Sequence, residues 1–322
     1  MNAFLLAEAF GRPAVIFIMG IFNNIFKICL LQCSFLPTIQ SRLLAGKADA
    51  KKLTKKSEAK KKPRLKTFNI YRYDPERKGS KPFMKKFTID LNECRPTVLD
   101  ALNKIKTEQD TTLTFRKSCR EGICGSCGMN IDGVNRLACL DKIKPKGVTK
   151  VYPLPHMYVI KDLVVDFHKF MEQHNRIKPF LIRDRPQKSQ QFLQSIKDRD
   201  NMIGLVECIL CACCSTSCPE YWWHGHSKEP NDFLGPAALL NSYRWITDSR
   251  DHATEERLND LKNYFSVFRC HQINNCTVCC PKRLVPGKAI AKLRLLVSGM
   301  AKKKKPDMEG TADSDPMKAC EK

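Results

Sequence analysis

The stretch Glu207–Pro219, which reads ECILCACCSTSCP, decides how this chain of 322 residues is interpreted. Its cysteines follow the spacing C-x2-C-x2-C-x3-C-P, at Cys208, Cys211, Cys214 and Cys218. A looser second run lies downstream, at Cys270, Cys276 and Cys280, and it also ends in proline. Thiolates at such spacings can wrap a metal–sulfide cluster within one loop. The sequence therefore predicts an iron–sulfur protein that conducts electrons.

A third cysteine block lies earlier, in the loop Ser118–Gly128, which reads SCREGICGSCG. The spacing Cys119-x4-Cys124-x2-Cys127, closed by Cys139, is the plant-type pattern for a [2Fe–2S] cluster. Glycines in the loop permit positive φ angles and let backbone amides approach sulfur. We therefore expect these four thiolates to hold a [2Fe–2S] cluster.

The two later runs are predicted to exchange ligands. In two-cluster bacterial ferredoxins, the fourth cysteine of each run serves the other cluster. By this rule a [4Fe–4S] cluster is held by Cys208, Cys211, Cys214 and Cys280. The other cluster is held by Cys218, Cys270 and Cys276, and the position of its fourth ligand is occupied by Ile273. Because isoleucine offers no ligand, a [3Fe–4S] cluster is predicted there. Cys213 and Cys279 are off the spacing and are expected non-ligands, although Cys279 could compete if the backbone shifted.

The surrounding pattern predicts an α+β chain of two modules. The pattern predicts a hairpin over Thr67–Tyr73 and Phe83–Leu91, followed by a helix that begins at Thr97. It also predicts a strand at Thr112–Phe115 that leads into the cysteine loop. Together these elements predict a β-grasp ferredoxin domain. The later runs are flanked by helical patterns at Gln190–Glu207, Pro236–Ser249 and Ala289–Val297. The expected organisation is a transit peptide (1–46), a lysine-rich linker (47–66), a [2Fe–2S] domain (67–160), a connecting segment (161–189), a mainly α-helical two-cluster domain (190–300) and a disordered tail (301–322).

The formal net charge of +23 is concentrated near the N-terminus, since residues 1–66 alone carry +10. No acidic residue occurs between Glu8 and Asp49, which is typical of a mitochondrial presequence. Two apolar runs, Ala14–Phe22 and Ile28–Leu36, could if joined form a poor membrane span or a secretory segment, and Met19 is an alternative start. The oxidising secretory route does not suit cluster-binding thiols. No nucleic-acid motif accompanies the charge, so nucleic acid is not an expected partner.

Disulfide bonding and zinc binding are two other uses of cysteine. Disulfide scaffolds belong to short secreted chains, and the adjacent pairs Cys213–Cys214 and Cys279–Cys280 are poor disulfide partners. Zinc also binds thiolates, but a single zinc site does not need a run of four spaced cysteines. Cys94 and Cys320 lie outside the spacing and are expected to have no cluster role, Cys94 as a small buried apolar residue.

Between Pro63 and Gly299 the chain resembles the iron–sulfur subunits of mitochondrial succinate dehydrogenase, respiratory complex II. The resemblance is carried by Ser118–Cys127, Tyr152–Leu163 (YPLPHMYVIKDL), Glu207–Pro219, Tyr221–Trp223 (YWW), Tyr243–Trp245 (YRW) and Cys270–Gly287. It implies a separate flavoprotein that oxidises succinate, two membrane-anchor subunits, and ubiquinone as the electron acceptor. No flavin-binding fingerprint occurs in this chain, so no catalytic residue for succinate oxidation is expected on it.

The resemblance also implies roles for particular residues. Pro219, Trp223, His271 and Ile273 match the quinone-proximal positions of the family, where an aromatic wall and an imidazole suit a quinone. Ile70-Tyr71-Arg72, and more loosely Val267-Phe268-Arg269, match tripeptides that cluster-transfer chaperones read. The implied location is the matrix side of the mitochondrial inner membrane, peripheral to it.

Some features depart from the resemblance. The segment His224–Asp232 is longer than usual and adds His224 and His226, an H-x-H pair that can bind metal or form a solvated loop. Gly128 and Cys279 stand where the family generally has alanine and threonine. The chain is therefore expected to be a divergent member. Fumarate reductase, which shares the architecture, and a non-respiratory metal-binding protein remain alternatives.

Overall fold

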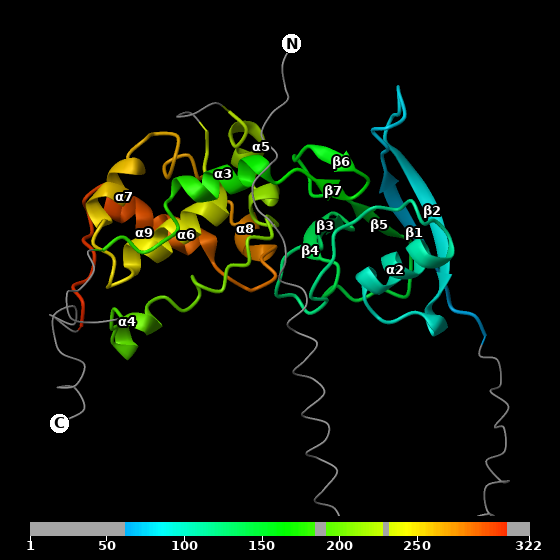
Figure 1. Cartoon of the computed structure of the whole chain (residues 1–322), viewed down its shortest axis with the longest axis horizontal. Helices are drawn as coiled ribbons and strands as arrows, with labels where there is room; N and C mark the ends of the chain where they lie inside the picture. Colours follow the sequence, from blue (N-terminus) through cyan, green and yellow to red (C-terminus); the bar gives the residue numbers. More distant parts are fainter. Residues whose placement is uncertain (1–61, 184–190, 228–231, 308–322) are drawn as a thin grey trace, which may run out of the picture. The chain divides into compact units, whose positions relative to one another are not determined.

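The computed structural model describes residues 62–183, 191–227 and 232–307. The first module is a five-stranded mixed sheet in the order β2-β1-β5-β3-β4 (Figure 1). β1 and β2 form the predicted hairpin, β1 pairs in parallel with β5, and the other neighbours are antiparallel. The strands are β1 (Leu65–Arg72), β2 (Phe83–Asp90), β3 (Gly128–Ile131), β4 (Val134–Leu137) and β5 (Thr149–Tyr152).

One helix, α2 (Val98–Glu108), supplies the apolar face that covers this sheet. Thr97 caps it, and its side chain and that of Asp100 form a reciprocal capping box. Val98, Leu99, Leu102 and Ile105, predicted to share a face, are all buried together with Phe68 and Ile70 of β1. The β-grasp arrangement is therefore confirmed, with a single core between helix and sheet.

The predicted strand at Thr112–Phe115 is wrong. Thr112 belongs to a turn, and Leu113–Phe115 join no strand ladder. The N–H of Thr114 donates to the carboxylate of Asp162 at 2.9 Å, and the carbonyl of Thr114 accepts from Leu163. Because the Asp162 side chain accepts from the Thr114 N–H, that N–H is not available to a strand ladder.

A short hairpin and a helix follow the first module. They are β6 (Val159–Lys161), β7 (Val164–Val165) and α3 (His168–Arg176). Val165 and Phe170 are buried in the core of the first module. Gln173 of α3 donates to the carbonyls of Gly225 and Phe233 in the second module. The segment expected only to connect the modules therefore packs against both.

The second module is helical, as predicted (Figure 1). Its longer helices α6 and α9 bury Leu239, Ile246, Ile290 and Leu293 in one core. The expected helix over Gln190–Glu207 is reduced to α4, and turns follow it up to the first cysteine run. The elements are α4 (Ile196–Asp200), η2 (Ser215–Ser217), α5 (Pro219–His224), α6 (Gly235–Thr247), α7 (Thr254–Asp260), α8 (Asn275–Val278) and α9 (Pro286–Val297).

Two predicted boundaries shift. β1 begins at Leu65, so Leu65 and Lys66 belong to the sheet and not to the predicted linker. The 3₁₀ helix η1 (Leu91–Glu93) follows β2 and ends the first hairpin. At the other end, Lys303 donates to the carbonyls of Asp248 and Asp251, so the start of the expected tail is bound to the second module. The predicted transit peptide, the linker up to residue 61, and Cys320 lie outside the described residues. Within the described ranges, no helix combines the length and the apolar character needed to cross a bilayer.

Candidate functional site

The plant-type loop folds so that backbone amides point at sulfur. Arg120, Gly122 and Gly125 have φ of 63°, 77° and 72°, which turns the chain back on itself. The Sγ of Cys119 accepts from the N–H groups of Glu121, Ile123 and Cys124 at 3.5, 3.3 and 3.3 Å. These amides lower the pKa of Cys119 to about 6, so the thiolate that iron requires is already favoured there.

The other thiols of this block lie beside it. Cys127 is close enough to Cys124 and Cys139 for a charge on either to change its pKa. Burial raises the pKa of Cys127 to about 12. A buried neutral thiol of this kind becomes a ligand by losing its proton as the metal binds. The structure thus brings together all four cysteines of the predicted [2Fe–2S] site.

The two later cysteine runs adopt the same unusual backbone. Leu210 and Ala212, two and four residues after Cys208, have φ of 53° and 61°. Gln272 and Asn274, two and four residues after Cys270, have φ of 59° and 66°. Left-handed φ is uncommon for residues other than glycine, so its repetition at equal offsets aligns the two runs. In this alignment Ile273 occupies the place of Cys211.

The thiols of these runs fall into two sets. Cys208, Cys211, Cys214 and Cys280 line one cavity, and charges on Cys211 and Cys280 raise the pKa of Cys208 in addition to the effect of burial. Cys218 lies within electrostatic reach of Cys270 and Cys276, and burial raises its pKa to about 11. The structure therefore groups Cys280 with the first run and Cys218 with the second.

The expected non-ligands have other partners. The thiol of Cys279 donates to the carbonyl of Cys213 at 3.2 Å and lies 3.1 Å from the Oγ of Ser217. Burial raises the pKa of Cys279 to about 12. Cys213 is fully buried. Cys94 is half-buried rather than buried, and it packs against the first core.

The first module contacts the first cysteine run directly. Asn135 of β4 is buried, and its Nδ2 donates to the carbonyl of Cys213 at 3.2 Å and to the Oγ1 of Thr216 at 3.0 Å. A Cβ atom at Gly128 would lie 3.1 Å from the carbonyl oxygen of Cys211. Glycine at this position, where the family generally has alanine, therefore eases a close approach of backbone.

The residues expected near a quinone lie at the start of α5 and in the second run. Pro219 is the first residue of α5, and Trp223 and Ile273 are exposed to 66% and 56%. His271 is also exposed. Trp222 differs from its neighbour, because it stacks on His156 with ring centroids 4.3 Å apart and donates to the carbonyl of Thr216. Of these two adjacent tryptophans, Trp223 is the exposed one.

Sequence reasoning missed Glu220, which lies among these residues. Its carboxylate is buried and faces His224, Arg269 and His271. Only its position between Pro219 and the YWW element, four residues before His224, could have drawn attention to it.

His224 and His226 do not form a shared metal site. The Nε2 of His226 lies 3.0 Å from the carbonyl oxygen of His156, whereas His224 faces Glu220 and Arg269. Each of the two residues has a protein partner and is partly exposed, whereas residues 228–231 of the longer segment lie outside the described residues, so the solvated loop stays a prediction.

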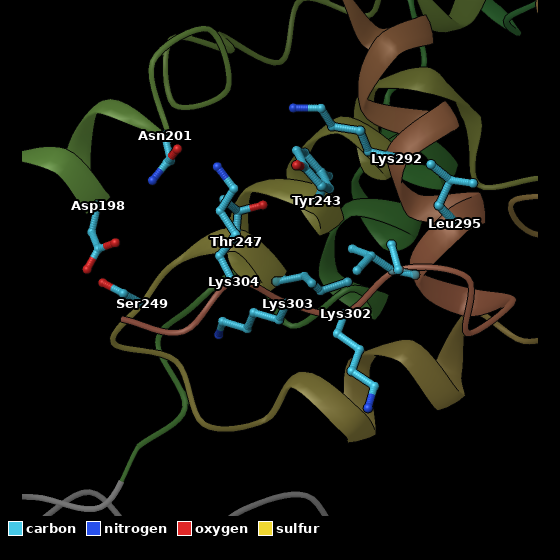
Figure 2. Close-up of a pocket in the computed structure, with 13 residues that line it drawn as sticks. Asp198, Asn201, Tyr243, Thr247, Ser249, Lys292, Leu295, Lys302, Lys303 and Lys304 are labelled. Carbon is cyan, nitrogen blue, oxygen red and sulfur yellow. The ribbon is translucent and has the colours of Figure 1, made fainter. Parts of the chain in front are cut away.

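A lysine-rich cavity lies apart from the cysteines (Figure 2). Tyr243, Thr247, Lys292 and Lys304 are among the residues that line it, and no cysteine does. Lys303 also lines it, and its Nζ donates to the carbonyls of Asp248 and Asp251. This cavity has no place in the electron-transfer site.

The donor chemistry of the three cysteine sets fits iron–sulfur clusters. Each set consists of thiols alone, and backbone amides are directed at the sulfur of Cys119. The Sγ of Cys270 additionally lies 3.8 Å from the Nε2 of Gln272. Such amide donors are the contacts that stabilise cluster sulfurs. In the part of the chain that the structure describes, no three His, Cys, Asp or Glu side chains meet closely enough to hold one metal ion.

Comparisons with known proteins agree with this architecture. Residues 67–172 match a 2Fe-2S iron-sulfur cluster binding domain, and residues 207–285 match a 4Fe-4S dicluster domain. The mitochondrial succinate dehydrogenase [ubiquinone] iron-sulfur subunit of Candida glabrata is 56% identical over 235 residues, which are 72% of this chain and 91% of that protein. A chain of the Mycobacterium smegmatis Sdh1 complex in the apo form has the same fold, with a TM-score of 0.65 and 22% identity over 74% of this chain and 98% of that one. From its sequence, its two cluster-binding domains and its α+β fold, the chain belongs to the family of succinate dehydrogenase iron–sulfur subunits.

Proposed function

We propose that this chain is the electron-transfer subunit of a mitochondrial succinate:ubiquinone oxidoreductase. When bound, [2Fe–2S], [4Fe–4S] and [3Fe–4S] clusters supply one-electron carriers between a succinate-oxidising flavoprotein and ubiquinone. The observation that carries the proposal is the repeated backbone of the two later runs, in which Ile273 takes the place of Cys211. A third cluster with only three thiolates is the feature that separates this chain from a simple two-cluster ferredoxin.

The ligand assignment follows from the grouping of the thiols. For the [2Fe–2S] cluster the proposed ligands are Cys119, Cys124, Cys127 and Cys139. For the [4Fe–4S] cluster they are Cys208, Cys211, Cys214 and Cys280, which share a cavity. For the [3Fe–4S] cluster they are Cys218, Cys270 and Cys276, because a charge on Cys270 raises the pKa of both Cys218 and Cys276.

The quinone side is proposed at the start of α5. Pro219 and His271 directly follow the proposed ligands Cys218 and Cys270, and Ile273 lies between Cys270 and Cys276. The exposed Trp223 and Ile273 offer an apolar surface. Exposed apolar groups of this kind suit a quinone ring and a partner surface. We therefore propose that two membrane-anchor subunits cover this side and that the chain sits on the matrix face of the inner membrane, peripheral to it.

Cluster delivery by transfer chaperones stays a prediction, and the fold constrains it. Ile70 is fully buried, and Arg72 is 8% exposed and paired with Asp110 and Asp162 at 2.6 and 2.8 Å. A chaperone that reads Ile70-Tyr71-Arg72 would therefore have to act before β1 joins the sheet. The second tripeptide, Val267-Phe268-Arg269, has its valine buried and its Phe268 exposed.

The test is electron paramagnetic resonance on the complex assembled in mitochondria, oxidised and then reduced with succinate and with dithionite. We expect a [3Fe–4S] signal in the oxidised sample, and signals from the other two clusters on reduction. Ubiquinone reduction by succinate should accompany them. A fully loaded complex without the oxidised three-iron signal would contradict the ligand assignment, and a complex that does not reduce ubiquinone would contradict the function.

A further inference from the structure

The carboxylate of Glu220 is held in one orientation by two neighbours. Its Oε2 accepts from the Nε of Arg269 at 3.2 Å and lies 3.0 Å from the Nδ1 of His224. The guanidinium of Arg269 also contacts the Nε2 of His224. Because a guanidinium can only donate, this Nε2 accepts and the proton of the His224 ring lies on Nδ1. Both neighbours therefore donate to the same carboxylate oxygen.

The second oxygen of Glu220 faces His271. Its Oε1 lies 2.8 Å from the Nε2 of His271. The side chain of His271 is 64% exposed, whereas that of Glu220 is 8% exposed. Among the described residues, Glu220 is the only one that the structure places in polar contact with the His271 ring. The buried carboxylate of Glu220, which His224 and Arg269 hold in place, therefore restricts the rotation of the exposed His271 ring.

We infer that Glu220 is the positioning residue for His271 on the quinone side of the three-iron site. The inference rests on the proposed function, because His271 meets a quinone only if this side binds one. With Nε2 donating to Glu220, Nδ1 is the ring nitrogen left for a ligand. In a neutral ring Nδ1 accepts from a hydroxyl of the reduced quinone, and it donates to a quinone carbonyl only when both ring nitrogens carry protons. Holding the ring in one plane removes rotational freedom that quinone binding would otherwise have to restrict.

The experiment replaces the carboxylate by its neutral isostere, E220Q, in the complex assembled with its partner subunits. Gln has one side-chain oxygen in place of the two carboxylate oxygens, so it cannot accept from Arg269 and from His271 at separate oxygens. His271 should therefore lose its fixed orientation. We expect the KM for a water-soluble ubiquinone analogue to rise roughly 3- to 10-fold. Reduction by succinate of a dye that takes electrons before the quinone should not change. E220D, which keeps the charge, should recover part of the loss.

The matched control is E172Q. Glu172 is an exposed carboxylate that lies 3.3 Å from the Nε2 of His168, so the same chemical change is made beside a histidine away from the cysteines. This variant should behave as the unmodified complex. A similar KM rise in E172Q and E220Q would mean that charge alone, and not the contact with His271, is responsible.

A double-mutant cycle separates positioning from mere structural support. His271 is exposed, so H271A should assemble. If Glu220 acts through His271, E220Q should raise the KM no further in the H271A background, and the binding constant of an inhibitory quinone analogue should follow the same pattern. Additive effects would overturn the inference. If E220Q does not assemble, H224A is the alternative variant, because it removes one donor to Glu220 and should give a smaller rise in KM. An unchanged KM in H224A would also overturn the inference.

The outcome also distinguishes this inference from the proposed function. An unmodified complex that fails to reduce ubiquinone contradicts the proposed function. An unmodified complex that reduces it normally, with a loaded E220Q variant of unchanged KM, contradicts only the role of Glu220.

Discussion

Gly125 packs so closely against Cys211 that a Cβ atom at position 125 would lie 3.0 Å from the Cβ of Cys211. It would also lie 2.9 Å from the carbonyl oxygen of Ile209. The plant-type loop and the first later run therefore meet backbone to backbone. We expect this contact to hold the clusters of the two loops close together, which favours electron transfer between them.

We expect G125A to weaken this contact. An alanine would overlap Ile209 and would be strained at a φ of 72°. The combined cost should be about 2–5 kcal/mol of folding free energy, since left-handed φ costs about 1–2 kcal/mol and overpacking about 1–3 kcal/mol. Thermal unfolding of the assembled complex and its iron content would measure the effect.

G133A is the matched control for that variant. Gly133 has a φ of 85° but nothing within 4 Å of a built Cβ, so alanine there adds backbone strain without overlap. G125A should cost more stability than G133A. Equal losses would show that the packing of the two loops contributes nothing.

Asn135 makes a second tie between the modules, and its loss should be measurable. N135L removes the hydrogen bonds from Asn135 to the Cys213 carbonyl and to Thr216, although the Cys213 carbonyl keeps the Cys279 thiol as a donor. Each lost hydrogen bond contributes about 0.5–1.5 kcal/mol, so the melting temperature should fall. Asn92 is exposed, and N92A should leave it nearly unchanged. A loss no larger in N135L than in N92A would contradict this role.

The cysteine spacing alone predicted both modules and the grouping of their thiols, because cluster binding demands thiols at fixed offsets. The β-grasp also followed from local signals, notably the Thr97 cap and the apolar face of the following helix. These features depend on neighbours in sequence, where pattern reasoning is strongest.

The failures came from contacts between distant residues. Thr112–Phe115 has the composition of a strand, but the carboxylate of Asp162, 48 residues further on, takes the Thr114 N–H. Glu220 was missed for the same reason, because His271 and Arg269 reach it only through the tertiary fold. No periodic pattern in the sequence indicates such long-range contacts.

Cys279 should prove dispensable for the clusters. Its thiol is occupied by the Cys213 carbonyl and Ser217, and burial keeps its pKa high. We expect C279S to retain the iron and acid-labile sulfide content and the three resonance signals of the unmodified complex. C276S, a change of the same kind three residues earlier, should lose the three-iron signal. Loss of that signal in C279S would show that Cys279 is a ligand.

Asp232 should give the second module an acid-sensitive contribution to stability. Burial alone would raise the pKa of Asp232, but hydrogen bonds from Arg176 and Gln173 and the charges of Arg176 and Lys169 hold it below its usual value. A carboxyl with a depressed folded-state pKa stabilises the protein above its unfolded pKa of about 3.9 and loses that contribution as the pH falls through the folded value.

D232N tests this dependence. At pH 7 it should melt at a lower temperature than the unmodified complex, with a loss of about 1–3 kcal/mol, because Arg176 loses a buried charged partner. The difference in unfolding free energy between D232N and the unmodified complex should stay constant down to about pH 5 and become smaller below about pH 4. D307N removes a partly exposed carboxylate paired with Lys197 and should shift the melting temperature little. If this stability difference becomes larger as the pH falls, the pKa of Asp232 is not lowered in the folded protein.

Ile273 gives the sharpest test of the cluster assignment. It stands where the repeated backbone of the first run carries Cys211, so I273C supplies a thiolate at the position of the missing ligand. We expect the oxidised three-iron signal to be replaced by a second [4Fe–4S] signal on reduction, with one more iron per chain. V278C is the matched control, because Val278 is 83% exposed on the neighbouring α8 and off the ligand spacing. If I273C keeps an unchanged three-iron signal, the register that aligns Ile273 with Cys211 is wrong. If V278C converts the cluster as well, an added cysteine near the site suffices and the alignment of the two runs is not what determines the cluster type.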